Sequence, residues 1–211
     1  FVGPGQPIPA ADVVILPGSK STASDLAWLK QQGWDNAIQR HLRYGGKVLG
    51  ICGGFQMLGE WVDDPDGLEG KPVKVAGLGL LPLTTRMVAG KQLRNVRGVT
   101  VAEGVTVTGY EIHNGVSEGQ ALNAPLFDIE GRPEGAVSED GQIIGTYLHG
   151  LFDHPEACQA LLKQLGLVNG EQSDYQAHRE RELDRVADML EAHIDIEAVI
   201  ALIDEGALPS Q

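Results

Sequence analysis

The segment Lys47-Val-Leu-Gly-Ile-Cys52-Gly-Gly-Phe-Gln56 decides the predicted fold. The apolar run from Lys47 to Ile51 indicates a buried strand, and a cysteine with two glycines follows it immediately. Helical character resumes at Phe55. A residue on a sharp turn between a strand and a helix lies at the carboxyl edge of its sheet, where open α/β sheets bind their ligands. The segment therefore predicts an α/β protein with Cys52 at a ligand-binding edge.

The flanking segments continue the alternation of strands and helices. Residues 12–16 form a β-branched run that ends at Pro17-Gly18, and they predict another buried strand. Helices are predicted over residues 21–32 and 37–44, and Gly45-Gly46 stops the second of them. This order of elements predicts a mostly parallel central sheet with helices on both faces, of the flavodoxin-like kind.

The rest of the chain is predicted to form short strands and then helices. Residues 63–80 are rich in Gly, Pro and Asp and predict a loop. Apolar runs between glycine turns predict short strands over residues 73–83, 93–102, 105–110, 136–138 and 142–147. Amphipathic patterns predict helices over residues 155–165 and 179–203. We therefore expect one domain over residues 1–211 that ends in a helical segment.

Charge and composition exclude several classes of function. The 211 residues include 16 Lys and Arg against 29 Asp and Glu, a net charge of −13, and 42% of them are hydrophobic. Such an acidic surface repels polyanions, which disfavours binding to nucleic acid or to anionic membranes. No apolar run reaches the roughly 18–20 residues of a transmembrane helix. Because there is no export signal and there are only two cysteines, we expect a cytoplasmic protein without a disulfide.

Cys52 is the candidate nucleophile. Gly50, Gly53 and Gly54 surround it with small residues, as a strained turn that a substrate must approach requires. The following helix directs its positive end at the sulfur and favours the thiolate, and the N–H of Gly53 is placed to stabilise an oxyanion. The alternative is a small buried hydrophobic residue, which is the usual role of a free cysteine. Cys158, in an apolar helical stretch, is expected to have that role.

A thiol nucleophile needs a base, and His149 is the candidate. It follows the predicted strand 142–147 directly, so the sheet that presents Cys52 also presents His149. His113 competes with it on position alone. The spacing of His149 and His154 is not that of H-E-x-x-H, and no metal site is expected.

The segment Gly18-Ser-Lys-Ser-Thr22 is similar to the end of a phosphate-binding loop. The first glycine of that motif is absent, because Val13 stands in its place. We therefore interpret the N–H groups of Gly18 and Ser19 as donors that complete an oxyanion hole with Gly53.

At these residues the chain resembles the class I (triad-type) glutamine amidotransferases. Their nucleophile motif has the form G-x-C-x-G-x-Q, and Gly50-Ile-Cys-Gly-Gly-Phe-Gln56 matches every fixed position. Within that superfamily the resemblance is closest to the glutaminase domains of cobyric acid synthases. It is carried by residues 16–22, 43–57, 109–113 and 145–152 and spans essentially the whole chain.

The resemblance implies a role for each matching residue. Cys52 would attack the amide of glutamine, and His149 would act as general base and acid. Gly18 and Gly53 would supply oxyanion donors, and Gln56 would contact the bound glutamine. The segment His113-Asn114-Gly115 would hold the α-groups of the substrate through its backbone.

The resemblance also implies partners outside this chain. The start at Phe1-Val-Gly-Pro rather than at a methionine suggests a cut within a longer protein. In the family an ATP-dependent synthetase domain precedes the glutaminase. It uses the ammonia to amidate the b, d, e and g carboxylates of adenosylcobyrinic acid a,c-diamide in cobalamin biosynthesis. ATP, Mg²⁺ and the corrinoid are therefore expected to bind that domain, and no cofactor is expected in this one.

One position departs from the wider superfamily. Typical members have H-x-E, with a glutamate that orients the histidine, and here that position is Leu151. Glu111 is a candidate for the orienting carboxylate. Three alternatives stay open: the glutaminase of another amidoligase (cobyrinate diamide synthase or cell-wall lipid amidation), an inactive domain that stabilises a partner, and a cysteine peptidase or esterase.

Overall fold

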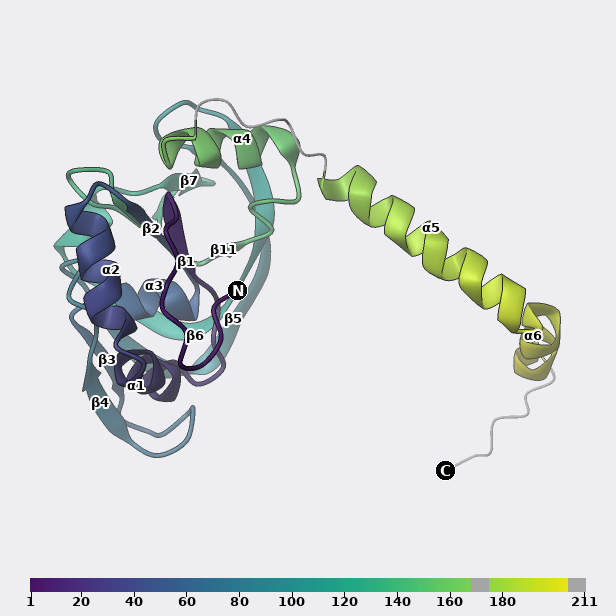
Figure 1. Cartoon of the computed structure of the whole chain (residues 1–211), viewed down its shortest axis with the longest axis horizontal. Coiled ribbons are helices and arrows are strands. Elements are labelled where there is room, and N and C mark those ends of the chain that lie inside the picture. The colour runs from purple at the N-terminus through teal and green to yellow at the C-terminus, as the bar shows by residue number, and fades with distance from the viewer. Residues whose placement is uncertain (168–174, 205–211) are drawn as a thin grey trace. The chain divides into compact units, whose positions relative to one another are not determined.

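The computed structural model describes residues 1–167 and 175–204 (Figure 1). The chain divides into two compact units, residues 1–171 and residues 172–211. The first unit contains the predicted strand–turn–helix segment and two sheets.

The first sheet contains the strands that the sequence predicts around Cys52. Its order is β1 (Val13–Leu16), β2 (Lys47–Ile51), β10 (Ile143–Thr146) and β9 (Ala136–Val137). Strands β1, β2 and β10 are parallel, and only β9 is antiparallel. The carboxyl ends of β2 and β10 therefore lie side by side, and these ends lead to Cys52 and to His149.

Strands β2 and β10 are buried on both faces of this sheet, as their apolar residues at successive positions predict. Val48 and Ile143 lie in one core cluster with Ile38 and Phe55, from helices α2 (Trp34–Arg43) and α3 (Gly53–Leu58). The neighbouring residues Leu49 and Ile144 lie in a second cluster. Helix α1 (Thr22–Gln31) packs beside α2 and α3. The α/β fold class predicted from the sequence is confirmed.

The second sheet differs from the predicted mostly parallel arrangement. Its order is β11-β6-β5-β3-β4, and only the pair β3–β5 is parallel. The strands are β3 (Trp61–Asp64), β4 (Val73–Ala76), β5 (Thr84–Thr100), β6 (Thr106–Glu118) and β11 (Leu148–His149), with β7 (Phe127–Ile129) and β8 (Arg132–Glu134) attached to β5; a 3₁₀ turn covers Gln120–Asn123. Strand β4 lies within the predicted strand 73–83, and predicted strands 93–102 and 105–110 are parts of one long hairpin.

Strands of this second sheet cover a face of the first sheet for which helices were predicted. The cluster around Leu49 and Ile144 contains Val96 from β5, Val107 from β6 and Leu161 from α4 (Pro155–Gln164). Figure 1 shows the long strand β5 curving around this side of the molecule. Helices therefore lie on both faces of the first sheet, as predicted, but on this side a curved antiparallel sheet supplies the rest of the cover beside α4.

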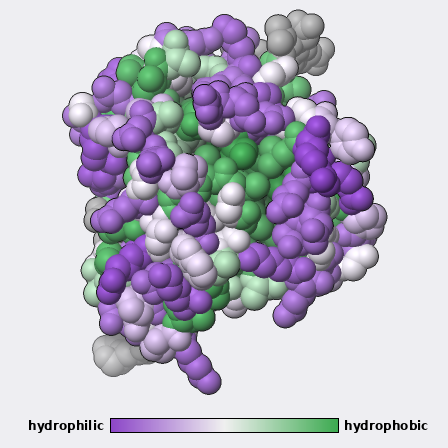
Figure 2. Space-filling view, turned by 90° about the vertical axis from the view of Figure 1, so that its left-hand side faces the viewer, coloured by the Kyte–Doolittle hydropathy of each residue, from purple (hydrophilic) through white to green (hydrophobic). Residues whose placement is uncertain are grey.

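Some apolar surface is not buried by this packing. Figure 2 shows an area of apolar side chains on one face, bordered by polar residues. Exposed large side chains of the first unit include Ile15, Trp28, Trp61, Leu93 and Tyr110. Apolar areas bordered by polar residues are typical of surfaces that contact another protein.

The second unit is helical, as predicted, but its helix is interrupted. Helix α5 (Tyr175–His193) ends before α6 (Ile196–Asp204) begins. The Oδ1 atom of Asp195 accepts the N–H of Ala198 at 3.0 Å, which is the bond of an N-cap residue and explains the new start. No helix in residues 1–167 and 175–204 is long and apolar enough to cross a membrane.

Gly145→Ala is expected to destabilise the first unit strongly. A Cβ at Gly145, in the middle of β10, would lie 1.9 Å from Cδ2 of the fully buried Phe55. Overpacking of this kind costs about 1–3 kcal/mol or more. The measurement is the free energy of unfolding from urea titration. Gly3→Ala is the control, because its Cβ would meet only the end of the flexible Gln6 side chain at 3.3 Å. Equal stability of the two variants would contradict the prediction.

Candidate active site

Cys52 occupies a strained turn between β2 and α3. Its backbone has φ 54° and ψ −110°, a conformation that L-residues rarely adopt. Its N–H donates to the carbonyl of Thr146 at 2.8 Å, and its carbonyl accepts the N–H of Gln56 at 3.1 Å. Such strain costs on the order of 1–3 kcal/mol and persists where surrounding structure holds it. This is the geometry of a nucleophile elbow.

The glycines beside Cys52 are required by backbone packing. A Cβ at Gly54 would lie 2.0 Å from the carbonyl oxygen of Leu16, and one at Gly50 would lie 2.8 Å from that of Gly54. A Cβ at Gly53 would lie 2.8 Å from the amide nitrogen of Ser19. The sequence explained these glycines by access of a substrate. The structure adds a second cause, which is the close contact of α3 with β1, β2 and the following loop.

His149 lies beside the turn, at the end of β11. A Cβ at Gly18 would lie 3.7 Å from Cβ of Cys52 and 3.7 Å from Cε1 of His149, so both side chains border the same point. The β11 backbone contacts β6 so closely that a Cβ at Gly109 would lie 2.0 Å from the carbonyl oxygen of His149. The parallel strands β2 and β10 thus bring together the two residues that the sequence singled out.

The imidazole of His149 is held in an apolar environment. Its ring stacks on that of Tyr110, with centroids 5.0 Å apart and planes inclined by 7°. Its Nε2 atom is buried and has no hydrogen-bond partner within residues 1–167 and 175–204. Burial lowers the pKa of His149 below its ordinary value. The ring is therefore neutral near pH 7 and is able to accept a proton.

The loop after β1 lies against the start of α3. Ser19 and Gly53 approach closely through their backbones, and Gly18 faces Cys52 and His149. The hydroxyl of Ser19 donates to Asp25 at 2.5 Å and accepts the N–H of Ser21 at 3.0 Å, so its side chain is bound within the loop. The backbone of this loop therefore lies against the turn, and the role of the N–H groups of Gly18, Ser19 and Gly53 in an oxyanion hole stays a prediction.

Gln56 lies next to the segment His113-Asn114-Gly115. A Cβ at Gly115 would lie 2.3 Å from Nε2 of Gln56. The Gln56 amide is buried; its Oε1 accepts the hydroxyl of Thr22 at 3.0 Å, and its Nε2 donates to the hydroxyl of Tyr147 at 3.4 Å. Because both ends of this amide have protein partners, a contact of Gln56 with glutamine also stays a prediction.

His113 is engaged by its own strand and by Tyr147. Its Nδ1 atom is 2.7 Å from the carbonyl oxygen of Gly115, and its ring stacks on Tyr147 with centroids 3.9 Å apart. Burial lowers the pKa of His113, although the bond to Gly115 acts in the opposite direction. Asn114 is half-buried on β6 between these residues. The sulfur of Cys52 contacts the same strand through the carbonyl of Ile112, 3.5 Å away.

Glu111 is bound to two arginines. Its carboxylate accepts hydrogen bonds from Nε of Arg94 and Nη2 of Arg132, each at 2.6 Å. Burial raises the pKa of Glu111, but the bonds and charges of Arg132 and Arg94 outweigh it and hold this pKa below the ordinary value. In the strand register Glu111 pairs with Leu148, whereas Tyr110 pairs with His149. The orienting role considered for Glu111 therefore has no support in these contacts.

Glu134 is a buried carboxyl group that the sequence did not single out. It is 4% exposed, and it accepts hydrogen bonds from the hydroxyl of Thr146 at 2.7 Å and from the N–H of Tyr147 at 2.6 Å. The hydroxyl of Thr146 in turn accepts the N–H of Leu148 at 2.9 Å. Glu134 thus fixes the backbone that leads into His149. In the sequence it was one acidic residue between a proline and a glycine, with no strand pattern to indicate burial.

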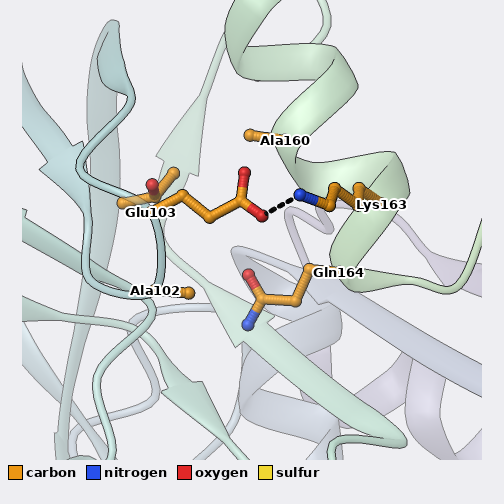
Figure 3. A pocket seen from close by; sticks show the side chains of 6 residues that line it. Ala102, Glu103, Ala160, Lys163 and Gln164 are labelled. Carbon is orange, nitrogen blue, oxygen red and sulfur yellow. Dashed lines mark hydrogen bonds and ion pairs between the residues drawn. The ribbon is translucent and has the colours of Figure 1, made fainter. Parts of the chain in front are cut away.

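A cavity with a different lining is bordered by α4. It measures about 180 Å³ and is lined by Thr100, Ala102, Glu103, Ala160, Lys163 and Gln164. Figure 3 shows Lys163 of α4 reaching across it to Glu103, and the ion pair measures 2.5 Å. No residue that the sequence singled out as catalytic or substrate-binding lines this cavity, so it does not belong to the candidate active site.

The resemblance implies glutamine as substrate, and the acid limb of its hydrolysis is expected to be centred below pH 6.5. Protonated His149 cannot accept the thiol proton, and burial lowers its pKa from the ordinary value of 6.5. The measurement is kcat/KM for glutamine between pH 5 and pH 9, because its pH dependence reports the pKa values of catalytic groups in the free enzyme. An acid limb centred above pH 6.5 would contradict the prediction and would show that pairing with the thiolate outweighs burial.

Comparisons with known proteins agree on the class of fold and enzyme. Residues 1–157 match the CobB/CobQ-like glutamine amidotransferase domain. A crystal structure of a glutamine amidotransferase superposes with a TM-score of 0.54 at 18% identity, covering 74% of this chain and 79% of that chain. The structure of PurLQS from Thermotoga maritima superposes with a TM-score of 0.50 at 19% identity, covering 78% of this chain and 77% of that chain. At these identities the two structures show the fold alone.

The α/β fold and the family match together define a glutamine amidotransferase, an enzyme that hydrolyses glutamine. More particularly, the chain belongs to the CobB/CobQ-like glutamine amidotransferase domain family.

Proposed function

We propose that Cys52 and His149 hydrolyse glutamine and that the ammonia serves the amidation reactions of a cobyric acid synthase. One observation carries the first part: a cysteine on a strained strand–helix turn adjoins a neutral histidine whose Nε2 atom is buried without a partner among the described residues. A buried polar atom of this kind requires an explanation, and an acceptor for the thiol proton supplies it.

The reaction proceeds in two halves. The imidazole of His149 takes the thiol proton, and the sulfur of Cys52 forms a bond to the amide carbon of glutamine. The resulting oxyanion accepts hydrogen bonds from the N–H groups of Gly53 and Gly18. When the C–N bond breaks, the imidazolium returns its proton to the leaving nitrogen and ammonia departs. A water molecule, deprotonated by His149, then cleaves the γ-glutamyl thioester to glutamate and restores the thiol.

The acceptor is proposed from the resemblance of particular segments. Residues 16–22 and 145–152 are similar to those of cobyric acid synthases, and the family match is to CobB/CobQ-like domains. In such an enzyme a synthetase domain binds ATP, Mg²⁺ and adenosylcobyrinic acid a,c-diamide and amidates its b, d, e and g carboxylates. This domain would need glutamine alone, without cofactor or metal. The apolar surface of Figure 2 is suited to contact with another protein domain.

The test follows nitrogen from glutamine to the corrinoid. The chain is mixed with a separately expressed synthetase domain of a cobyric acid synthase, ATP, Mg²⁺, the a,c-diamide and glutamine labelled with ¹⁵N in its amide. We expect labelled amides at the b, d, e and g positions by mass spectrometry. A parallel mixture with the synthetase domain of a cobyrinate diamide synthase and cobyrinic acid tests that alternative, in which the a and c positions would be labelled more efficiently.

Two results would overturn parts of this proposal. Glutamate release without label in either corrinoid would leave the glutaminase and reject the corrinoid acceptor, in favour of another amidoligase. No glutamate release, together with no labelling of Cys52 by a glutamine-analogue electrophile, would reject the catalytic role of Cys52 and favour a domain that only stabilises its partner.

A further inference from the structure

Neither of the two positions considered for a carboxylate that orients His149 supplies one. Leu151, at the position of the glutamate of H-x-E, is 3% exposed and lies in the second apolar core cluster. The carboxylate of Glu111 is bound by Arg94 and Arg132. Within residues 1–167 and 175–204, the Nε2 atom of His149 has no hydrogen-bond partner. Something other than these two positions must fix the plane of the ring if the histidine is to transfer protons efficiently.

Tyr110 makes the contact that defines this plane. Its ring lies parallel to the imidazole, with an interplanar angle of 7° and a centroid distance of 5.0 Å. The two residues are direct partners in the register of β6 and β11, where side chains of opposite residues lie on the same face of the sheet. Gly109 allows β11 to approach β6 closely, so the backbones of Tyr110 and His149 are also held at a fixed separation.

The position of Tyr110 is not explained by core packing. Its side chain is 41% exposed, whereas Leu148 and Glu111, the neighbouring register pair, are almost fully buried. An exposed aromatic ring stacked on a histidine limits rotation of the imidazole and covers one of its faces from water. Cys52 lies beside the ring from the β2–α3 turn, so the imidazole is bordered by the nucleophile and by Tyr110.

We propose that Tyr110 is the positioning residue of His149, and that its ring fixes the imidazole plane by stacking in place of an orienting carboxylate. The inference rests on the proposed role of His149 as base. Tyr110 acts through His149 and does not itself exchange a proton with the substrate. Phenylalanine retains the stacking surface and leucine removes it, so the two replacements separate the ring from the hydroxyl.

The test compares Tyr110→Phe and Tyr110→Leu with the wild-type chain, with Val99→Ala as control. Val99 is an exposed residue on the same face of the β5–β6 hairpin, because its partner Thr106 and Tyr110 are separated by an even number of positions. Steady-state hydrolysis gives kcat and KM for glutamine. The pH dependence of Cys52 alkylation by iodoacetamide gives a second readout that needs no turnover.

We expect Tyr110→Phe and Val99→Ala to remain within about threefold of wild type. Tyr110→Leu is expected to lower kcat about 10- to 100-fold with little change in KM, because misplacement of a catalytic group by about 1 Å has effects of this size. Its alkylation profile is expected to shift to higher pH, because a misplaced imidazole no longer takes the thiol proton and stabilises the thiolate.

Two outcomes would overturn the inference. One is a Tyr110→Leu variant with the kcat and the alkylation profile of wild type. The other is a Tyr110→Phe variant as impaired as Tyr110→Leu, which would assign the effect to the hydroxyl. Absence of turnover in the wild-type chain would instead reject the proposed function, and the alkylation profiles would still decide whether Tyr110 acts on His149.

Discussion

Replacement of Cys52 by alanine is expected to lower glutamate release by more than about 10⁴-fold, as loss of a covalent nucleophile does in other enzymes. The thioester half-reaction cannot occur without the sulfur, and no other cysteine takes its place. Cys158, the second cysteine, lies on α4. Glutamate release from glutamine, coupled to glutamate dehydrogenase, measures the effect. Cys158→Ala is the matched control and is expected to retain full activity.

The same position also predicts a change in stability. With φ at 54° and ψ at −110°, Cys52 holds a conformation that glycine adopts without strain. Cys52→Gly is therefore expected to be more stable than Cys52→Ala, by about 1 kcal/mol after the entropy cost of glycine is included. Urea unfolding of the two inactive variants provides the comparison. Activity in Cys52→Ala would refute the role of Cys52 as nucleophile. A Cys52→Gly variant less stable than Cys52→Ala would refute backbone strain at this position.

Replacement of Glu134 by alanine is expected to destabilise the first unit by about 3 kcal/mol or more. It leaves the N–H of Tyr147 and the hydroxyl of Thr146 without their acceptor, and it opens a cavity at a residue that is 4% exposed. Because this segment leads into His149, hydrolysis of glutamine is expected to decrease as well. The free energy of unfolding in urea measures the first effect, and kcat measures the second.

Glu134→Gln isolates the charge of this group. Burial raises the pKa of Glu134 to about 7, although its bonds to Thr146 and Tyr147 act in the opposite direction. Below pH 4.5 the group is protonated in both the folded and the unfolded chain. Between pH 4.5 and 7 the unfolded chain loses this proton while the folded chain keeps it, so stability is lost as pH rises through 7.

Relative to wild type, Glu134→Gln is therefore expected to gain stability between pH 4.5 and pH 7, on the order of 3 kcal/mol. Subtracting the unfolding free energy of wild type from that of the variant at each pH removes the contributions of all other titrating groups. Glu103→Gln makes the same chemical change at the surface, in the ion pair with Lys163, and serves as control. Parallel stability curves for wild type and Glu134→Gln would show that burial does not perturb the carboxyl.

Several elements of the site could be predicted because their signals are local. Strands β1, β2 and β10 were apparent as short apolar runs, and glycines marked the turn at Cys52. The position of His149 after β10 then followed from the rule that parallel strands share one carboxyl edge. The close backbone contacts of Gly53 and Gly54 could not be predicted, since they involve Ser19 and Leu16, which lie more than 30 positions earlier.

The sequence by itself determined the α/β class, the cysteine turn and the histidine at the end of a neighbouring strand. Each depends on residues that adjoin in the chain, where period and turn chemistry act directly. Only the tertiary structure decided the antiparallel second sheet, the stacking of Tyr110 on His149 and the buried Glu134 beneath Thr146 and Tyr147. Strand register and desolvation arise from contacts between distant segments, and a one-residue shift in register would exchange Tyr110 for Glu111 beside the histidine.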